Sequence, residues 1–362
     1  MSQWNVDAVE AGLAQITDPL TGQDLKSSGV VRDVRVCPDG AEIDIRLGYP
    51  ADDLISDLEK RVRSQLLERM GQGEVTVNIS WRVMSHRVQG ELKPHKSIRN
   101  IIAVGSGKGG VGKSSTAVNL ALGLARAGAQ VGILDADIYG PSIPRMLGVS
   151  GQPDTDGKRI KPKRAYGLQV MSIGFLVDEE TPMVWRGPMV TSALQQLLSE
   201  TDWEALDYLI IDLPPGTGDI QLTLAQKIPV AGAVIVTTPQ DIALLDARKA
   251  LQMFRKVGVK VLGVIENMSI HRCAQCGHEE AIFGHDGGVE MAAQYEIPLL
   301  GQLPLSPEIR KGLDQGKPTV AVQPDSSLAE NYLGCARRTA AALSLQPRNL
   351  KMDLPQVALK NL

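Results

Sequence analysis

A glycine-rich segment near residue 110 carries the residue types best suited to chemistry. From Ile101 to Ser115 the chain reads IIAVGSGKGGVGKSS and fits the phosphate-loop pattern G-x-x-x-x-G-K-[ST]. Glycines let backbone N–H groups converge on phosphate oxygens, and a helix that begins near Lys113 presents its positive end to the same anion. The alternative, a glycine-rich turn with a chance lysine, leaves the apolar strand before it and the helix after it unexplained.

Polar side chains in and near this loop complete a nucleotide site. Lys113 would reach the β and γ phosphates, and the hydroxyl of Ser114 would bind Mg²⁺. Asp212 ends the apolar strand in YLIIDLPPG, where a carboxylate can hold Mg²⁺, usually through a water ligand. The glycines between Pro214 and Asp219 suit a switch that senses the γ phosphate. The predicted loop residues are Gly107, Lys108, Gly109, Gly110, Val111, Gly112, Lys113, Ser114 and Ser115.

A second candidate site is the C-x-x-C pair Cys273 and Cys276, in the segment SIHRCAQCGHEE. Thiolates separated by two residues converge on one metal. A thioredoxin-like redox pair would need a helix N-terminus, which this loop does not offer. A zinc site in one chain could recruit His271, His278 or His285, and that alternative stays open. A disulfide does not suit a reducing cytosol.

Composition narrows the class of protein. The chain has 362 residues, enough for two domains, and a net charge of -3, which does not favour bulk binding to nucleic acid. No apolar run approaches the roughly 20 residues of a membrane span, and the N-terminus lacks the pattern of a signal peptide. With four cysteines, two of them paired in C-x-x-C, we expect a cytoplasmic protein that binds neither nucleic acid nor membrane.

The order of apolar patterns predicts four segments. Residues 1–84 read as a small α+β domain, with a hairpin turn at Pro38-Asp39-Gly40. Residues 85–97 are polar and read as a linker. In residues 98–345 apolar strands alternate with helices, which predicts a P-loop NTPase with a mostly parallel sheet covered by helices on both faces. Residues 346–362 read as a frayed tail.

The loop also holds a second lysine, Lys108, so that it reads G-K-G-G-V-G-K-S-S. This resembles the deviant Walker A signature of the dimerising ATPases, which include nitrogenase iron protein, the arsenite-pump ATPases and the Min/Par proteins. The resemblance implies a homodimer around ATP, in which Lys108 reaches the partner's nucleotide as an arginine finger does. It also implies slow basal hydrolysis, because the switch needs dimer closure or a client to order it. A solvated loop lysine is the alternative.

The same resemblance implies roles for three more strand-end residues. In LDAD, Asp137 would orient the attacking water, and Asp135 would be its switch partner or, as an alternative, a helix cap. In VIENM, Asn267 would read the adenine edge, and a turn asparagine is the alternative.

The deviant Walker A loop together with a late C-x-x-C resembles the Mrp/ApbC family of iron–sulfur cluster carrier ATPases. Further matching segments are DIYGPSIP from Asp137, WRGPM from Trp185, and FG followed by DGG from Phe283. The N-terminal segment, with its D-P-x-x-G opening, resembles the small domain of iron–sulfur assembly proteins. The extra N-terminal cysteine cluster of the eukaryotic relatives is absent, and Cys37 and Cys335 read as structural.

This resemblance implies that Cys273 and Cys276 of two protomers hold one 4Fe-4S cluster across a two-fold axis. The expected partners are a second copy of the chain, a cluster-assembly scaffold and apo iron–sulfur client proteins. Two other hypotheses compete. A Min/Par-type positioning ATPase with a structural zinc would need a basic patch or amphipathic tail, and neither is evident. A nitrogenase-type reductase would need single, widely spaced cysteines.

Overall fold

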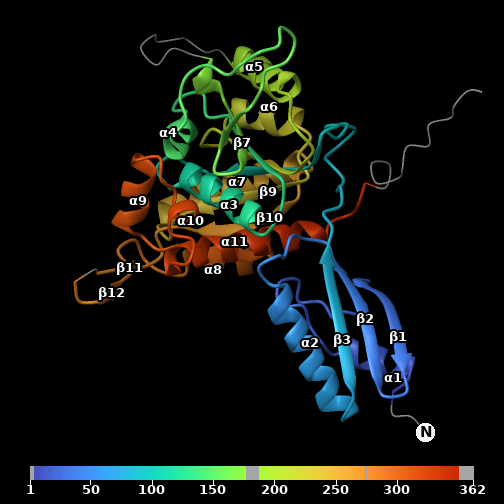
Figure 1. Cartoon of the computed structure of the whole chain (residues 1–362). Coiled ribbons are helices and arrows are strands. Elements are labelled where there is room, and N and C mark those ends of the chain that lie inside the picture. Colours follow the sequence, from blue (N-terminus) through green and yellow to red (C-terminus); the bar gives the residue numbers. More distant parts are fainter. Residues whose placement is uncertain (1–3, 177–186, 274, 350–362) are drawn as a thin grey trace, which may run out of the picture.

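The computed structural model describes residues 4–176, 187–273 and 275–349. They form a small N-terminal unit beside a larger unit built on an eight-stranded sheet (Figure 1). Trp185 and Arg186 of the WRGPM segment, and residues 350–362 of the expected tail, lie outside the described residues. In the part of the chain that the structure describes, no helix is long and apolar enough to cross a bilayer.

The N-terminal unit packs two helices against a three-stranded sheet of order β1-β2-β3. The predicted hairpin is confirmed, since β1 and β2 pair antiparallel up to the Cys37–Gly40 pair, and β3 then adds parallel to β2. Alternation on β2 buries Ile43, Ile45 and Leu47, and α2 packs against the neighbouring strand β3. The elements are α1 (Val6–Leu13), β1 (Val31–Cys37), β2 (Gly40–Leu47), α2 (Ile55–Met70) and β3 (Glu74–Trp81).

The large sheet has the order β13-β10-β9-β4-β8-β5-β7-β6 and is parallel except where β6 meets β7. Its central strands are buried along their whole length, as expected for a sheet covered on both faces. The strands are β4 (Ile98–Gly105), β5 (Val131–Asp135), β6 (Lys163–Ala165), β7 (Leu168–Ser172), β8 (Leu206–Asp212), β9 (Gly232–Thr237), β10 (Val261–Glu266) and β13 (Leu299–Gln302).

Helices cover both faces because the sheet is wound in two directions from β4. The connection from β4 to β5 runs one way along the sheet, whereas those from β8 through β9 and β10 to β13 run the other way, so right-handed crossovers place their helices on opposite faces. On the first face α3 packs against α11, and on the second α7 packs against α8. The helices are α3 (Lys113–Arg126), α4 (Ile143–Leu147), α5 (Gly187–Glu200), α6 (Asp219–Lys227), α7 (Asp241–Lys256), α8 (Gly287–Tyr295), α9 (Pro307–Asp314), α10 (Thr319–Val322) and α11 (Ser327–Ser344), with a 3₁₀ turn at Ile173–Phe175.

The polar segment 85–97, which the sequence predicts to be a linker, is bonded to the large unit. Gln89 is buried; its amide donates to the carbonyls of Ala225 (2.7 Å) and Ile228 (2.6 Å), and its Oε1 accepts from the N–H of Val230 (2.9 Å). The N–H of the buried His86 donates to Asn100 Oδ1 at 3.0 Å. At roughly 1 kcal/mol net for each hydrogen bond, these contacts fix the segment to the large unit.

Candidate nucleotide and thiol sites

The phosphate loop lies between β4 and α3, as the sequence predicts. Gly112 caps α3 with a φ of 81°, in the left-handed region that favours glycine. Gly107 lies so close to α7 that a Cβ atom would come within 2.0 Å of the Asp246 backbone. Both glycines are therefore required by the path of the loop.

Lys113 lies in a buried acidic centre. Its ammonium donates to Asp212 Oδ1 at 2.6 Å and is 3.7 Å from Asp137 Oδ2. The Lys113 side chain is 5% exposed and that of Asp212 is fully buried. The structure thus brings together three predicted residues: Lys113 at the start of α3, Asp212 at the end of β8 and Asp137 in the loop after β5. Ser114 joins them, since its Oγ lies 3.3 Å from Lys113 Nζ.

Asp135 supports the loop that carries Asp137. Its Oδ1 accepts from the N–H of Asp137 (3.1 Å), and its Oδ2 accepts from the N–H of Ile143 (3.1 Å) and the hydroxyl of Ser172 (3.2 Å). Burial, together with the negative charge of Asp212, raises the pKa of Asp135 to about 7. This geometry corresponds to the capping alternative, because the side chain holds the first residue of α4.

The acidic centre fits Mg²⁺. Asp137 Oδ1 and Asp212 Oδ2 are buried and accept no hydrogen bond from the described residues. Burial raises the pKa of Asp137, although the charge of Lys113 opposes that rise. Buried carboxylate oxygens without donors are costly unless a cation or its water ligands satisfy them, and Mg²⁺ prefers such oxygens.

The segment between Pro214 and Asp219, which the sequence predicts to be a switch, is bonded to the phosphate loop. The N–H of Gly216 donates to the Ser106 carbonyl at 2.9 Å, and Ser106 Oγ donates to the Lys108 carbonyl at 2.9 Å. Gln221 on α6 donates to the Pro215 carbonyl at 2.6 Å. Sequence reasoning missed Ser106 and Gln221, since both act through backbone contacts that no motif records.

Asn267 lies beside the phosphate loop, with its Nδ2 donating to the Val111 carbonyl at 2.8 Å. A Cβ atom on Gly112 would come within 2.1 Å of the same nitrogen. Next to it, the buried Glu266 accepts from the N–H of Gly288 (2.6 Å) and from Gln302 (2.8 Å). Sequence reasoning missed Glu266, although a carboxylate at the end of an apolar strand could have signalled it.

Lys108 and exposed large apolar side chains lie at the same edge of the sheet, where the carboxyl ends of its parallel strands meet. Within the described ranges Lys108 forms no ion pair, and its side chain is partly exposed. Tyr139, in the loop after Asp137, is 64% exposed, and Ile242 on the first turn of α7 is 70% exposed. Exposed apolar side chains grouped around a charged site are typical of an interaction surface.

The two cysteines lie in a short hairpin that extends from the large unit (Figure 1). Its strands, β11 (His271–Arg272) and β12 (Glu279–Glu280), pair antiparallel. The N–H of Cys273 donates to the His278 carbonyl, and the N–H of Gly277 donates to the Cys273 carbonyl, both at 2.9 Å. Cys273 is half-buried and Cys276 is exposed. Ala274, between them, lies outside the described residues.

The thiol of Cys273 receives hydrogen bonds that favour its thiolate form. Hydrogen bonds from the backbone of Cys276 and Gln275, and from the Cys276 side chain, lower the pKa of Cys273. His271 is held elsewhere, since its Nδ1 lies 3.1 Å from the Leu305 carbonyl. Among the described side chains, no three Cys, His, Asp or Glu residues converge as metal ligands. Cys335 is buried in α11 and Cys37 is exposed in the N-terminal unit.

Comparison with known families decides the relationship. The family described as NUBPL iron-transfer P-loop NTPases matches residues 97–340, and the iron–sulfur cluster assembly protein family matches residues 6–79. The chain belongs to the family of iron-transfer P-loop NTPases. The resemblance to iron–sulfur cluster carrier ATPases and the predicted fold class are therefore confirmed.

Individual relatives agree with this family. An "Iron-sulfur cluster carrier protein" of Haemophilus influenzae is 48% identical over 93% of this chain and 92% of its own. The "Iron-sulfur cluster transfer protein NUBPL" of Mus musculus is 51% identical over 70% of this chain and 81% of its own. The structure of a nucleotide-binding protein from Archaeoglobus fulgidus, in complex with ADP, is 37% identical over 65% of this chain and 91% of its own, with a TM-score of 0.57.

Proposed function

We propose that this iron-transfer P-loop NTPase is an ATP-dependent carrier that holds an iron–sulfur cluster on Cys273 and Cys276 and transfers it to apo-proteins. The observation that carries the proposal is the hairpin that projects two adjacent thiols from the unit that binds the nucleotide. A second protein can reach this hairpin, where Cys276 is exposed and Cys273 is half-buried, as transfer of a cluster requires. Relatives described as iron–sulfur cluster carrier and transfer proteins support the same cargo.

The cluster would be a 4Fe-4S cluster shared by two protomers. A cuboidal cluster takes four protein thiolates, and one C-x-x-C supplies two. A homodimer with a two-fold axis beside the hairpins would supply the other two. The exposed Tyr139 and Ile242 support dimer formation through the edge that carries the nucleotide site.

The nucleotide would be ATP with Mg²⁺. Lys113 would exchange its bond to Asp212 for the β and γ phosphates, which would free Asp212 and Ser114 to bind the metal ion. Asp137 would orient the attacking water, and Lys108 would contribute charge to the partner's nucleotide. We further propose that Asn267 reads the adenine edge and that the protein acts in the cytoplasm, with slow basal ATP hydrolysis.

Metal analysis of anaerobically reconstituted protein tests the cargo. Wild type should contain about two iron and two sulfide per protomer, since four of each are shared by two chains. Cys276→Ala should lose both, because each substitution removes two of the four ligands in the dimer. His278→Ala, two residues away and exposed, is the matched control and should retain both.

The same measurement can refute the proposal. Stoichiometric zinc without iron absorbance, lost equally in Cys276→Ala and His278→Ala, would instead show a structural zinc site within one chain. Mössbauer spectra of the reconstituted wild type would identify the cluster type.

A further inference from the structure

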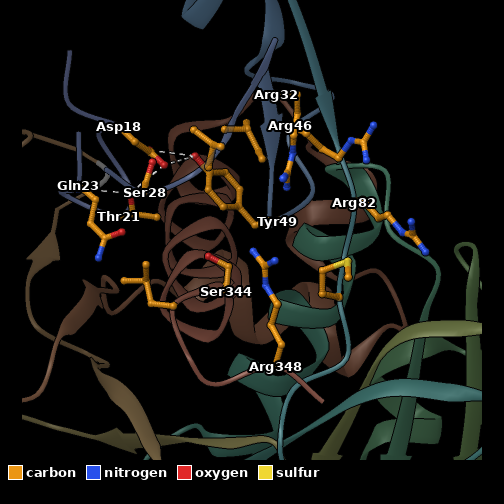
Figure 2. A pocket seen from close by; sticks show the side chains of 15 residues that line it. Asp18, Thr21, Gln23, Ser28, Arg32, Arg46, Tyr49, Arg82, Ser344 and Arg348 are labelled. Carbon is orange, nitrogen blue, oxygen red and sulfur yellow. Dashed lines mark hydrogen bonds between the residues drawn. The ribbon is translucent and has the colours of Figure 1, made fainter. Parts of the chain in front are cut away.

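A cavity of about 250 Å³ lies where the N-terminal unit meets the end of α11 (Figure 2). Four parts of the chain line it: the loop after α1 with Asp18, the strands β1 and β2 with the turn after β2, the segment after β3 with Arg82, and the end of α11 with the segment up to Arg348. Because both units contribute walls, the cavity exists only when they are docked. It is separate from the phosphate loop and from the cysteine hairpin.

Four arginines line this cavity: Arg32, Arg46, Arg82 and Arg348. In Figure 2 the guanidinium group of Arg348 points toward the strands that carry Arg32 and Arg46. Within the described ranges, none of the four forms an ion pair with a carboxylate. Like charges that converge without counterions repel one another, so the cluster is unfavourable unless an anion neutralises it.

Arg35, on the same strand, shows the contrasting arrangement. It faces Asp33, Glu42 and Asp44 at 3.5, 3.1 and 2.9 Å, and is therefore neutralised by the protein itself. The sheet thus supplies acidic partners to one arginine and leaves the cavity arginines without any. From this difference we infer that the positive charge in the cavity serves to bind a ligand and does not serve only to keep the protein soluble.

Local backbone geometry brings Arg32 to the cavity. The pairing of β1 with β2 shifts between Val31 and Asp33, so that Arg32 is the extra residue of a β-bulge. Bulges re-aim a side chain and are frequent beside functional sites. Partial burial, with the charges of Arg46 and Arg348, lowers the pKa of Arg32, which places the three guanidinium groups within mutual electrostatic reach.

The wall of the cavity that contains Asp18 and Tyr49 is polar, and its side chains form hydrogen bonds with one another. Both carboxylate oxygens of Asp18 accept from the Tyr49 hydroxyl at 2.9 Å, and they also accept from the N–H of Leu20 and the hydroxyl of Thr21, both at 2.9 Å. Burial and the Asp18 charge raise the pKa of Tyr49 far above its usual range, so the hydroxyl remains a donor. Asp18 is thus occupied by its own loop and is not the counterion of the arginines.

We propose that this cavity binds a small multivalent anion, of the phosphate or polycarboxylate class, at the junction of the two units. Guanidinium groups match such oxyanions because they donate two parallel hydrogen bonds. The volume of about 250 Å³ lies just below the roughly 300–1,000 Å³ of sites for drug-sized ligands, which favours a compact ligand. An anion held by Arg32 and Arg348 would also fasten the N-terminal unit to the ATPase unit.

Calorimetric titration of the full-length protein with inorganic pyrophosphate and with citrate tests this site at physiological ionic strength. Arg32→Gln/Arg348→Gln should bind the preferred probe about tenfold or more weakly, whereas Arg35→Gln, the matched control, should bind like wild type. Lys113→Ala removes the phosphate loop as an alternative site, so binding that survives this change belongs to the cavity. Binding of pyrophosphate alone or citrate alone would support the site and identify the ligand class.

Three results would overturn the proposal. Neither probe binds the Lys113→Ala protein at millimolar concentration; Arg32→Gln/Arg348→Gln binds as tightly as wild type; or Arg35→Gln weakens binding as much as the double variant does. Circular dichroism and ATP hydrolysis should be unchanged in the double variant, which shows that the loss is not a folding defect.

Discussion

Removal of the Lys113 ammonium should destabilise the protein as well as abolish ATP hydrolysis. Lys113→Met keeps the length of the side chain but leaves Asp212 fully buried without its cation, and leaves Asp137, 13% exposed, without its neighbour at 3.7 Å. Breaking a buried ion pair by removing one partner costs about 3–5 kcal/mol. Because a domain is typically stable by about 5–15 kcal/mol, the Lys113→Met protein should still fold. Its loss of stability can then be measured as a shift of the urea concentration at the midpoint of unfolding.

A double-mutant cycle isolates this pair. Asp212→Asn alone leaves Lys113 beside Asp137, and Lys113→Met/Asp212→Asn removes both buried charges. The double variant should therefore be more stable than Lys113→Met, with a coupling free energy of about 2 kcal/mol or more. Urea unfolding followed by circular dichroism, without nucleotide and with EDTA, provides the values.

The pH dependence provides an internal check. Burial raises the pKa of Asp137 and the charge of Lys113 opposes that rise, so without the lysine the Asp137 carboxylate is protonated more readily, which relieves the defect. The destabilisation of Lys113→Met should therefore be larger at alkaline pH than at mildly acidic pH. A Lys113→Met protein that unfolds at the wild-type urea concentration, or a coupling free energy near zero, would refute the buried ion pair.

Three further predictions follow from the site and the junction. Lys108→Ala and Lys113→Ala should each lack ATPase activity, and mixing the two should restore measurable hydrolysis, because one site of the mixed dimer then has both lysines; no restoration would contradict action across a dimer. Burial raises the pKa of Asp135 to about 7, against 3.8 in the unfolded chain, so between those pH values the native state binds more protons than the unfolded state. The free energy of unfolding should therefore fall by up to about 4 kcal/mol as the pH rises from 3.8 to 7. Asp135→Asn should flatten this fall, as measured by urea unfolding at a series of pH values. A chain that begins at Met84 should be about 3 kcal/mol more stable to urea than one that begins at Ser97, which lacks the three hydrogen bonds of Gln89, while both bind ATP; equal stability would mean that segment 85–97 contributes nothing.

Local patterns in the sequence were sufficient for much of the fold. The phosphate loop, the apolar strand that ends at Asp212 and the hairpin at Cys37–Gly40 are set by neighbouring residues, and the structure has all of them. Such features follow from turn chemistry and side-chain periodicity, which one sequence displays directly.

Features that depend on distant partners could not be predicted in this way. Strand β7 escapes pattern reasoning because Gln169 interrupts its apolar run, yet Gln169 is buried and exchanges hydrogen bonds of 3.0 and 2.9 Å with the Glu204 backbone. Segment 85–97 reads as a linker because its contacts to the core are polar, and only the fold shows their acceptors. The sequence leaves open whether Asp135 is a switch partner or a helix cap, and only the fold shows its capping bond to the N–H of Ile143.

Strand β10 connects the two sites through a short and firmly held stretch of chain. Asn267, at its end, is bonded to the phosphate loop through Val111. From there to the hairpin the backbone is fixed to the segment after β13, since the N–H of Ser269 donates to the Leu303 carbonyl (3.0 Å) and the N–H of Leu305 donates to the Ile270 carbonyl (2.8 Å). Because these hydrogen bonds hold the backbone between Asn267 and Cys273, a shift of the phosphate loop on nucleotide binding would be transmitted along this stretch to Cys273. Under the proposed function, the same stretch would provide a physical route by which the nucleotide governs how tightly Cys273 and Cys276 hold a cluster.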